Sequence, residues 1–148
     1  SHRVLDGKEY RRLSVNNRSI KAWQLPDSRE TRLMKPTMMN HPSAIWCRQS
    51  DKNYLWLYNL WCELLKEFTY RYGKTHACAR LVPDLAMIPN NIPKGNFTGP
   101  TPAMPDEVKI AGDSMASYKN YYINNKQHLA SWQGKINSRP VPNWFQTT

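Results

Sequence analysis

Apolar residues recur every three or four positions along the middle of the chain. The members of this stripe are Tyr54, Leu57, Tyr58, Trp61, Leu64, Leu65, Phe68 and Tyr72. This spacing is typical of the buried face of an amphipathic α-helix, and further leucines and a tryptophan widen the apolar surface beyond one stripe. Ser50 can cap the N-terminus and Gly73 the C-terminus. The pattern therefore predicts a central core helix over residues 50–73, contacted on more than one side.

A second helical pattern follows later in the chain. One face would carry Met115, Tyr118, Tyr122, Asn125, Leu129 and Trp132, flanked by Lys119, Lys126 and His128. Asp113 or Ser114 can serve as the N-cap. This pattern predicts a second long helix over residues 114–134.

Between the two predicted helices, residues 83–105 contain six prolines. Each proline removes a backbone donor and restricts the residue before it, so we expect no lasting regular element there. The segment also contains methionine, isoleucine and phenylalanine. These apolar residues favour a loop that wraps against the core over a free linker.

The two ends of the chain give weaker patterns. Residues 1–40 are polar, basic and mostly irregular, with one short strand expected around residues 20–25 before a turn. Residues 1–7 resemble the last turn of a helix closed by Gly7, so we expect a further segment ahead of them. The tail, residues 139–148, contains Trp144 and Phe145, which can pack on the core or stack on a nucleobase.

These elements predict a mainly α fold: a compact, single-domain helical protein spanning residues 1–148, with long proline-rich loops. The hydrophobic fraction of 40% is enough for a real core. Charges and prolines interrupt every apolar run well before the ~18 residues of a membrane span, so we expect no membrane contact. Three dispersed cysteines indicate reduced thiols in a cytoplasmic compartment.

Charge narrows the choice of partner. The formal net charge is +10, and residues 1–50 contribute ten cations against four carboxylates. A basic excess of this size favours a polyanionic partner, most simply nucleic acid. The alternative is a soluble basic protein without such a partner.

Basic and aromatic residues cluster at both ends of the helix predicted over 50–73. The first group is His41, Trp46 and Arg48, and the second is Arg71, Lys74 and His76. The first group can border one cleft at the helix N-terminus, where anions bind. A helix of this length spans ~33 Å, so a duplex lying along the domain could contact both groups. Alternatively, Arg71 and Lys74 only complement the helix dipole.

Candidate catalytic chemistry is sparse. The sequence contains no phosphate-binding glycine loop, no dinucleotide-binding pattern and no zinc quartet. Asp106 and Glu107 follow a proline, where they could bind a metal, act as acid and base with His41, or start a short helical turn. His76 and Cys78 supply only half of a metal site. We therefore expect no metal and no cofactor.

Six runs along the chain resemble a family of small phage-encoded proteins. They are WQLPDSRE, HPSAIWCRQSDKNYLWL, EFTYRYGKTH, AMPDE, SYKNYYINNK and PNWF. Members of that family usually carry a segment ahead of the position matching SHRVLDG. The family in turn resembles, more distantly, the phage pyrimidine-dimer DNA glycosylases of the endonuclease V type. The shared feature is the order of elements, from a histidine-containing segment to an Arg-Pro and an aromatic tail.

The resemblance implies a helical, metal-free enzyme that flips out a base. Such enzymes form a Schiff base between an N-terminal amine and the sugar, assisted by a glutamate on the first helix. No residue of this chain matches that amine or that glutamate, so the catalytic residues are unknown, with His41, Asp106 and Glu107 as candidates. The expected nucleic-acid contacts are Arg48, Arg71, Lys74, His76, Lys119, Lys126, Arg139 and Trp144.

The leading functional hypothesis is a DNA-binding protein that resembles a base-excision DNA glycosylase/AP lyase acting on damaged pyrimidines. The expected partner is double-stranded DNA. The expected location of the protein is the cytoplasm of an infected bacterial cell or the virion. One alternative is a non-catalytic nucleic-acid-binding or structural phage protein. Another is a small enzyme of nucleotide metabolism that uses His41, Asp106 and Glu107. The sequence leaves the lesion and the oligomeric state open.

Overall fold

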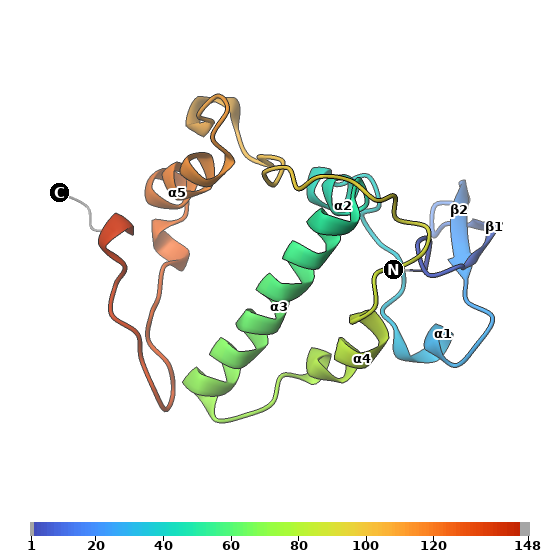
Figure 1. The fold of residues 1–148 in the computed structure, drawn as a ribbon, viewed down its shortest axis with the longest axis horizontal. Helices are drawn as coiled ribbons and strands as arrows, with labels where there is room; N and C mark the ends of the chain where they lie inside the picture. Colours follow the sequence, from blue (N-terminus) through green and yellow to red (C-terminus); the bar gives the residue numbers. More distant parts are fainter. Residues whose placement is uncertain (1, 146–148) are drawn as a thin grey trace.

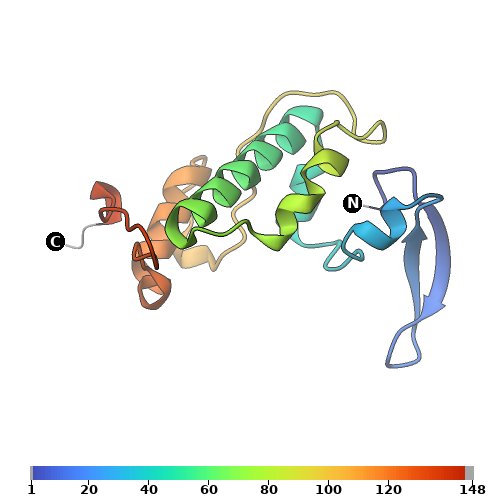
Figure 2. The same cartoon turned by 90° about the horizontal axis from the view of Figure 1, so that it is seen from below.

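The computed structural model describes residues 2–145, and helix is their main regular structure. Helices account for 43% of the chain and strands for 8%. A β-hairpin lies at one end of an elongated molecule and the C-terminal segment at the other, with the long helix α3 between them (Figures 1 and 2). The structure is therefore helical, as expected, but it also contains a small sheet.

The N-terminal region is more regular than expected. Strands β1 (Lys8–Leu13) and β2 (Ser19–Gln24) pair antiparallel over their full length. The turn between them is closed by a bond from the Ser14 amide to the Arg18 carbonyl at 2.8 Å. The strand predicted near residues 20–25 is present as β2. Its partner β1 escaped prediction because all six of its residues are exposed, so no apolar alternation marks it.

A tight turn precedes the hairpin. The Gly7 amide donates to the His2 carbonyl at 2.9 Å, and Asp6 adopts the left-handed conformation with φ of 63°. This six-residue closure is the bond pattern of a helix C-terminus, although the left-handed residue is Asp6 and not Gly7. A Cβ atom at Gly7 would lie 2.4 Å from the His2 oxygen, which explains the glycine there.

The central helix has the predicted boundaries. After α1 (Arg29–Arg32) and α2 (Pro42–Cys47), α3 spans Asp51–Tyr72. Ser50 Oγ accepts the Asn53 amide at 3.1 Å, and Gly73 ends the helix with φ of 62°. Both predicted caps therefore form.

Other segments contact α3 on more than one side, as predicted, but α3 is not the buried core helix that the pattern predicted. Only Asn53 of its 22 residues is buried. The 3₁₀ turn η1 (Ala77–Leu81) and α4 (Val82–Leu85) run beside the first part of α3, where Tyr54 Oη donates to the Leu85 carbonyl at 2.8 Å. The proline-rich segment contacts the N-terminal end of α3 and the C-terminal segment contacts its other end, but several apolar side chains of the helix stay exposed (Figure 1). Helical periodicity identified which residues share a face but not how much of each face is covered.

The buried core is small and lies near the N-terminal half of α3. Its apolar members are Val4, Leu5, Leu25, Leu33, Leu81 and Ile92, with Tyr54, Trp61, Cys78 and Leu85 packed against it. The core thus joins the N-terminal turn, the hairpin base, α4 and α3. It holds the hairpin against the helical part.

The proline-rich segment wraps the N-terminus of α3, as predicted for residues 83–105, although Pro83 lies in the first turn of α4. The Asp51 amide donates to the Pro93 carbonyl at 2.9 Å. The buried Asn53 side chain accepts a hydrogen bond from the Thr98 amide through Oδ1 at 2.9 Å. Its Nδ2 donates to Thr98 Oγ1 at 3.0 Å. Side chains at the N-terminus of α3 therefore form hydrogen bonds with backbone groups of the proline-rich segment, which has little regular structure of its own.

The second helix is shorter than predicted. After η2 (Asp106–Val108), α5 spans Ser114–Asn125, so the prediction of a helix to residue 134 is wrong. Asp113 caps it by accepting the Ala116 amide at 2.9 Å. Asn124 bonds back to the Asn120 carbonyl at 2.9 Å, and asparagines that bond to the backbone favour helix ends.

Two short turns follow α5 in the part of the chain that the structure describes. They are η3 (Gln127–Leu129) and η4 (Asn143–Phe145). The ring of Phe145 lies 4.7 Å from that of Trp132, so this part of the tail packs on the protein. Residues 146–148 of the predicted tail lie outside the described residues. Among residues 2–145, no helix combines the length and apolar character needed to cross a bilayer.

Candidate nucleic-acid interface

The hairpin carries the densest positive charge in the structure. Between residues 8 and 24 there are five cations, Lys8, Arg11, Arg12, Arg18 and Lys21, and one carboxylate, Glu9. All residues of β1 are exposed. The hairpin extends away from the helices (Figure 2). Its cations are therefore accessible to a large anionic partner.

The register of the hairpin places like charges opposite each other. Arg11 lies directly across from Lys21, an arrangement that destabilises an isolated antiparallel pair. Glu9 offsets part of this repulsion through an ion pair with Lys21 at 3.0 Å, and Arg11 donates to Ser19 Oγ at 3.2 Å. An anion bound along the strands would remove the remaining repulsion.

At the C-terminal end of α3, two of the predicted contacts share one carboxylate. Arg71 Nε lies 2.8 Å from Glu67 Oε1, and Arg139 Nη2 lies 3.0 Å from Glu67 Oε2. The Arg139 guanidinium also lies 3.9 Å from the ring centre of Tyr70. Hydrogen bonds from Arg139 and then Arg71 lower the pKa of Glu67. These arginines attach the C-terminal segment to α3.

The other two residues of this group differ in their surroundings. His76 Nδ1 accepts the Cys78 amide at 3.1 Å, and its ring packs edge-on against Phe68. His76 thus caps η1 and faces the protein. Lys74 is exposed just beyond Gly73. Among the predicted contacts here, Lys74 is the most accessible to a phosphate.

Substituting Glu67→Gln tests whether this end of α3 belongs to the interface. The change removes the negative charge that Arg71 and Arg139 share. If both arginines reach phosphates, duplex affinity should rise and the salt dependence should steepen by up to about one phosphate equivalent. The matched control is Glu63→Gln, because Glu63 lies on the same helix and pairs only with Lys66 among the described residues. Equal affinities for the two variants would exclude Arg71 and Arg139 from the interface.

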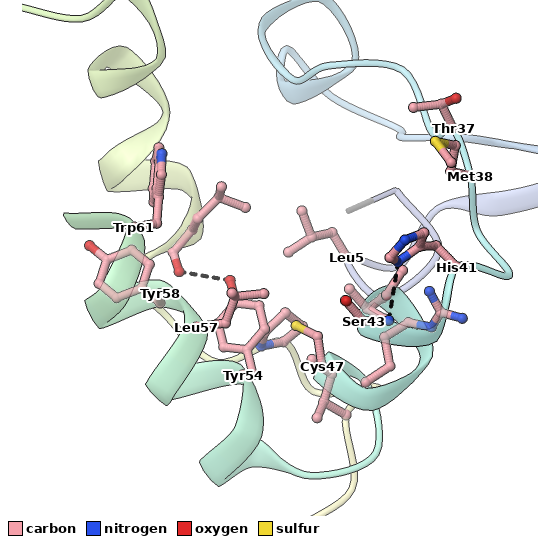
Figure 3. Close-up of a pocket in the computed structure, with 16 residues that line it drawn as sticks. Leu5, Thr37, Met38, His41, Ser43, Cys47, Tyr54, Leu57, Tyr58 and Trp61 are labelled. Atoms are coloured by element: carbon pink, nitrogen blue, oxygen red, sulfur yellow. Dashed lines mark hydrogen bonds between the residues drawn. The ribbon is translucent and has the colours of Figure 1, made fainter. Parts of the chain in front are cut away.

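A cavity of about 520 Å³ lies between the N-terminal turn, α2, α3 and α4. Figure 3 shows Tyr54, Tyr58 and Trp61 of α3 on one side of it, with Ser43 of α2 and its N-cap residue His41 across from them. Arg48 also lines it, as predicted for a cleft at the helix N-terminus. Trp46, the third member predicted for this cleft, does not line it, because its side chain is buried against Trp56 and Phe97.

The polar groups of the cavity have distinct roles. His41 caps α2, with Nδ1 accepting the Ser43 amide at 3.2 Å. Arg48 Nη2 donates to the Met39 carbonyl at 2.9 Å, and burial lowers the pKa of its guanidinium. Burial also raises the pKa of the Cys47 thiol, which therefore stays protonated and weakly nucleophilic at neutral pH. The cavity thus offers an aromatic wall and a cation.

The candidate catalytic residues do not share one site. Asp106 and Glu107 lie in the first turn of η2, which packs against α5, and neither lines the cavity that His41 borders. Asp106 is almost fully exposed and pairs with Lys109 at 2.6 Å. The helix-start interpretation of the two carboxylates therefore holds. His41, Asp106 and Glu107 therefore do not form the single site that the nucleotide-metabolism hypothesis requires.

The remaining predicted contacts lie on α5 and the tail. The ammonium of Lys119 is 5.9 Å from the ring centre of Trp144, and that of Lys126 is 5.3 Å from Tyr121. Trp144 is 41% exposed. This end of the molecule lies far from the hairpin (Figure 1). The predicted contacts thus occupy three separate regions.

Sequence reasoning missed the individual hairpin cations. The only signal was the excess of positive charge in residues 1–50. Within residues 2–145, no group of three or more histidine, cysteine, aspartate or glutamate side chains could hold a metal ion. Comparison with family models, curated proteins and solved structures gave no match.

Proposed function

We propose that this protein binds double-stranded DNA and that the β1–β2 hairpin is its main contact. The observation that carries the proposal is an exposed, extended two-stranded ribbon with five cations and one carboxylate. The major groove of B-DNA admits a two-stranded β-ribbon, and its walls are lined by phosphates.

The distribution of cations over the two faces of the ribbon supports this mode of binding. Neighbouring strand residues point to opposite faces, so Arg11 and Arg12 extend from different sides of β1. Arg11 shares its face with Lys21, and Arg12 shares its face with Lys8. A ribbon lying in a groove meets phosphates on both sides, and both faces of this one can neutralise them.

The test is the salt dependence of binding to a short duplex, measured by fluorescence anisotropy. If all five cations contact phosphates, log affinity should fall with log salt concentration with a slope of about −4 to −5. A duplex should bind more tightly than either of its single strands. A slope near zero would contradict the proposal, because no cation would then be displacing counterions.

A second candidate function is base excision, as carried out by a glycosylase/AP lyase. Under this proposal the protein comes from a phage and acts in the cytoplasm of the infected bacterium or in the virion. The aromatic-walled cavity beside Arg48 favours it, because an extruded base needs aromatic surfaces on which to stack. Borohydride trapping on abasic or ultraviolet-irradiated duplex, with the full gene product, tests it. A covalent adduct would support catalysis. Salt-dependent binding without an adduct would leave a non-catalytic DNA-binding protein.

A further inference from the structure

The chain exposes much more surface than a folded monomer of its size. Its accessible surface is 10,567 Å², whereas a compact monomer of 17.3 kDa exposes about 7,800 Å². The excess of about 2,800 Å² exceeds the roughly 1,000–2,500 Å² that each protomer of a typical obligate homodimer contributes to its interface. Within residues 2–145, only eight apolar residues are buried, and six of them form the core. The area that remains open is therefore sufficient for a stable dimer.

Helix α3 contributes more exposed large apolar residues than any other element among the described residues. Leu57, Leu60 and Leu64 follow the i, i+3, i+7 spacing of one helical stripe and are 36%, 50% and 63% exposed. We call these three residues the leucine strip. A strip of this kind is usually covered by another helix. Here Leu57 borders the cavity between α2, α3 and α4, whereas Leu60 and Leu64 are at least half exposed.

A hollow adjoins the leucine strip. It has a volume of about 400 Å³, and most of its lining is apolar side chains of α3, namely Trp61, Leu64, Leu65, Phe68 and Tyr72. Glu67 and Arg71 of α3, together with His76 and Cys78 beyond it, complete the lining. Projecting leucines beside a largely apolar hollow can interlock with the same features of a second, identical chain. An interface that repeats the same patch on both partners has this property.

The charge of α3 distinguishes a protein partner from nucleic acid. Its three carboxylates, Asp51, Glu63 and Glu67, balance its three cations, Lys52, Lys66 and Arg71. The helix is therefore formally neutral in a chain with a net charge of +10. A neutral helix offers little attraction to phosphates, and it allows two basic protomers to meet without opposing positive charges.

We infer that a second copy of this chain packs against the leucine strip and the adjoining hollow, so that the protein is a dimer through α3. The contact does not depend on DNA binding. The experiment is sedimentation velocity, over a range of micromolar concentrations, on the whole chain and on Leu60→Glu and Leu64→Glu. The whole chain should sediment with about twice the monomer mass of 17.3 kDa. Each glutamate variant should sediment as a monomer, because dimerisation would bury its unpaired charge.

Leu129→Glu is the matched control, since Leu129 is 64% exposed but lies beyond α5. It should remain dimeric. Circular dichroism distinguishes dissociation from unfolding, and a monomeric variant that keeps its helix content supports the inference. A whole chain that remains monomeric at the highest concentration would overturn it. Dimers of both strip variants would overturn it as well.

Discussion

Replacing Arg11 and Arg12 together by alanine is expected to weaken duplex binding roughly tenfold or more near physiological salt and to flatten the salt slope by about two. Both arginines lie on exposed β1, one on each face of the ribbon. Their removal should leave the fold intact, because neither contributes to the buried core. Fluorescence anisotropy at several salt concentrations measures both quantities.

The matched control is the double variant Lys66→Ala/Lys109→Ala. It removes the same charge from exposed residues that pair with Glu63 and Asp106 outside the hairpin. If binding arose only from the net charge of +10, both double variants would lose affinity equally. A larger loss for the hairpin variant would identify the ribbon as the contact. An equal loss would contradict the proposed binding mode.

Features that depend on neighbouring residues could be predicted from the sequence, whereas features that depend on contacts between distant segments could not. The boundaries of α3 were predictable because Ser50 and Gly73 act on neighbouring backbone groups. The length of α5 was not, because apolar spacing continued to Trp132 while Asn124 bonded back to the helix. Strand β1 has no pattern of its own and depends on pairing with β2. Burial along α3 depended on which distant segments return to it.

The same distinction applies to the candidate site. Cation counts pointed to residues 1–50, but only the hairpin register brings Arg11 opposite Lys21. Arg71 and Arg139 are predicted contacts to DNA, and in the structure both pair with Glu67. Arg139 is 72 residues from that carboxylate, so sequence spacing gave no indication of the pair. Clustered charge thus indicated where cations are dense in the sequence, but not which residues each cation contacts in the fold.

The substitution with the largest expected effect on stability is Trp46→Ala. Trp46 is 2% exposed, and its Nε1 donates to the Thr98 carbonyl at 3.0 Å. Its ring packs edge-on against Trp56 and Phe97 at 5.7 and 6.3 Å. Truncating a buried tryptophan costs about 3–5 kcal/mol of unfolding free energy. Domains of this size have about 5–15 kcal/mol in total, and a small core favours the lower end.

Urea denaturation followed by circular dichroism measures this loss, at one protein concentration because dimerisation would contribute to stability. Trp144→Ala is the control, because it removes the same side chain from a 41% exposed position in the tail. It should cost less than about 1 kcal/mol, within the range of surface substitutions. Trp46→Phe should fall between them, because it keeps an aromatic ring but loses the bond to Thr98. Similar urea midpoints of unfolding for Trp46→Ala and Trp144→Ala would mean that the contacts of Trp46 do not stabilise the packing of the proline-rich segment against α2 and α3.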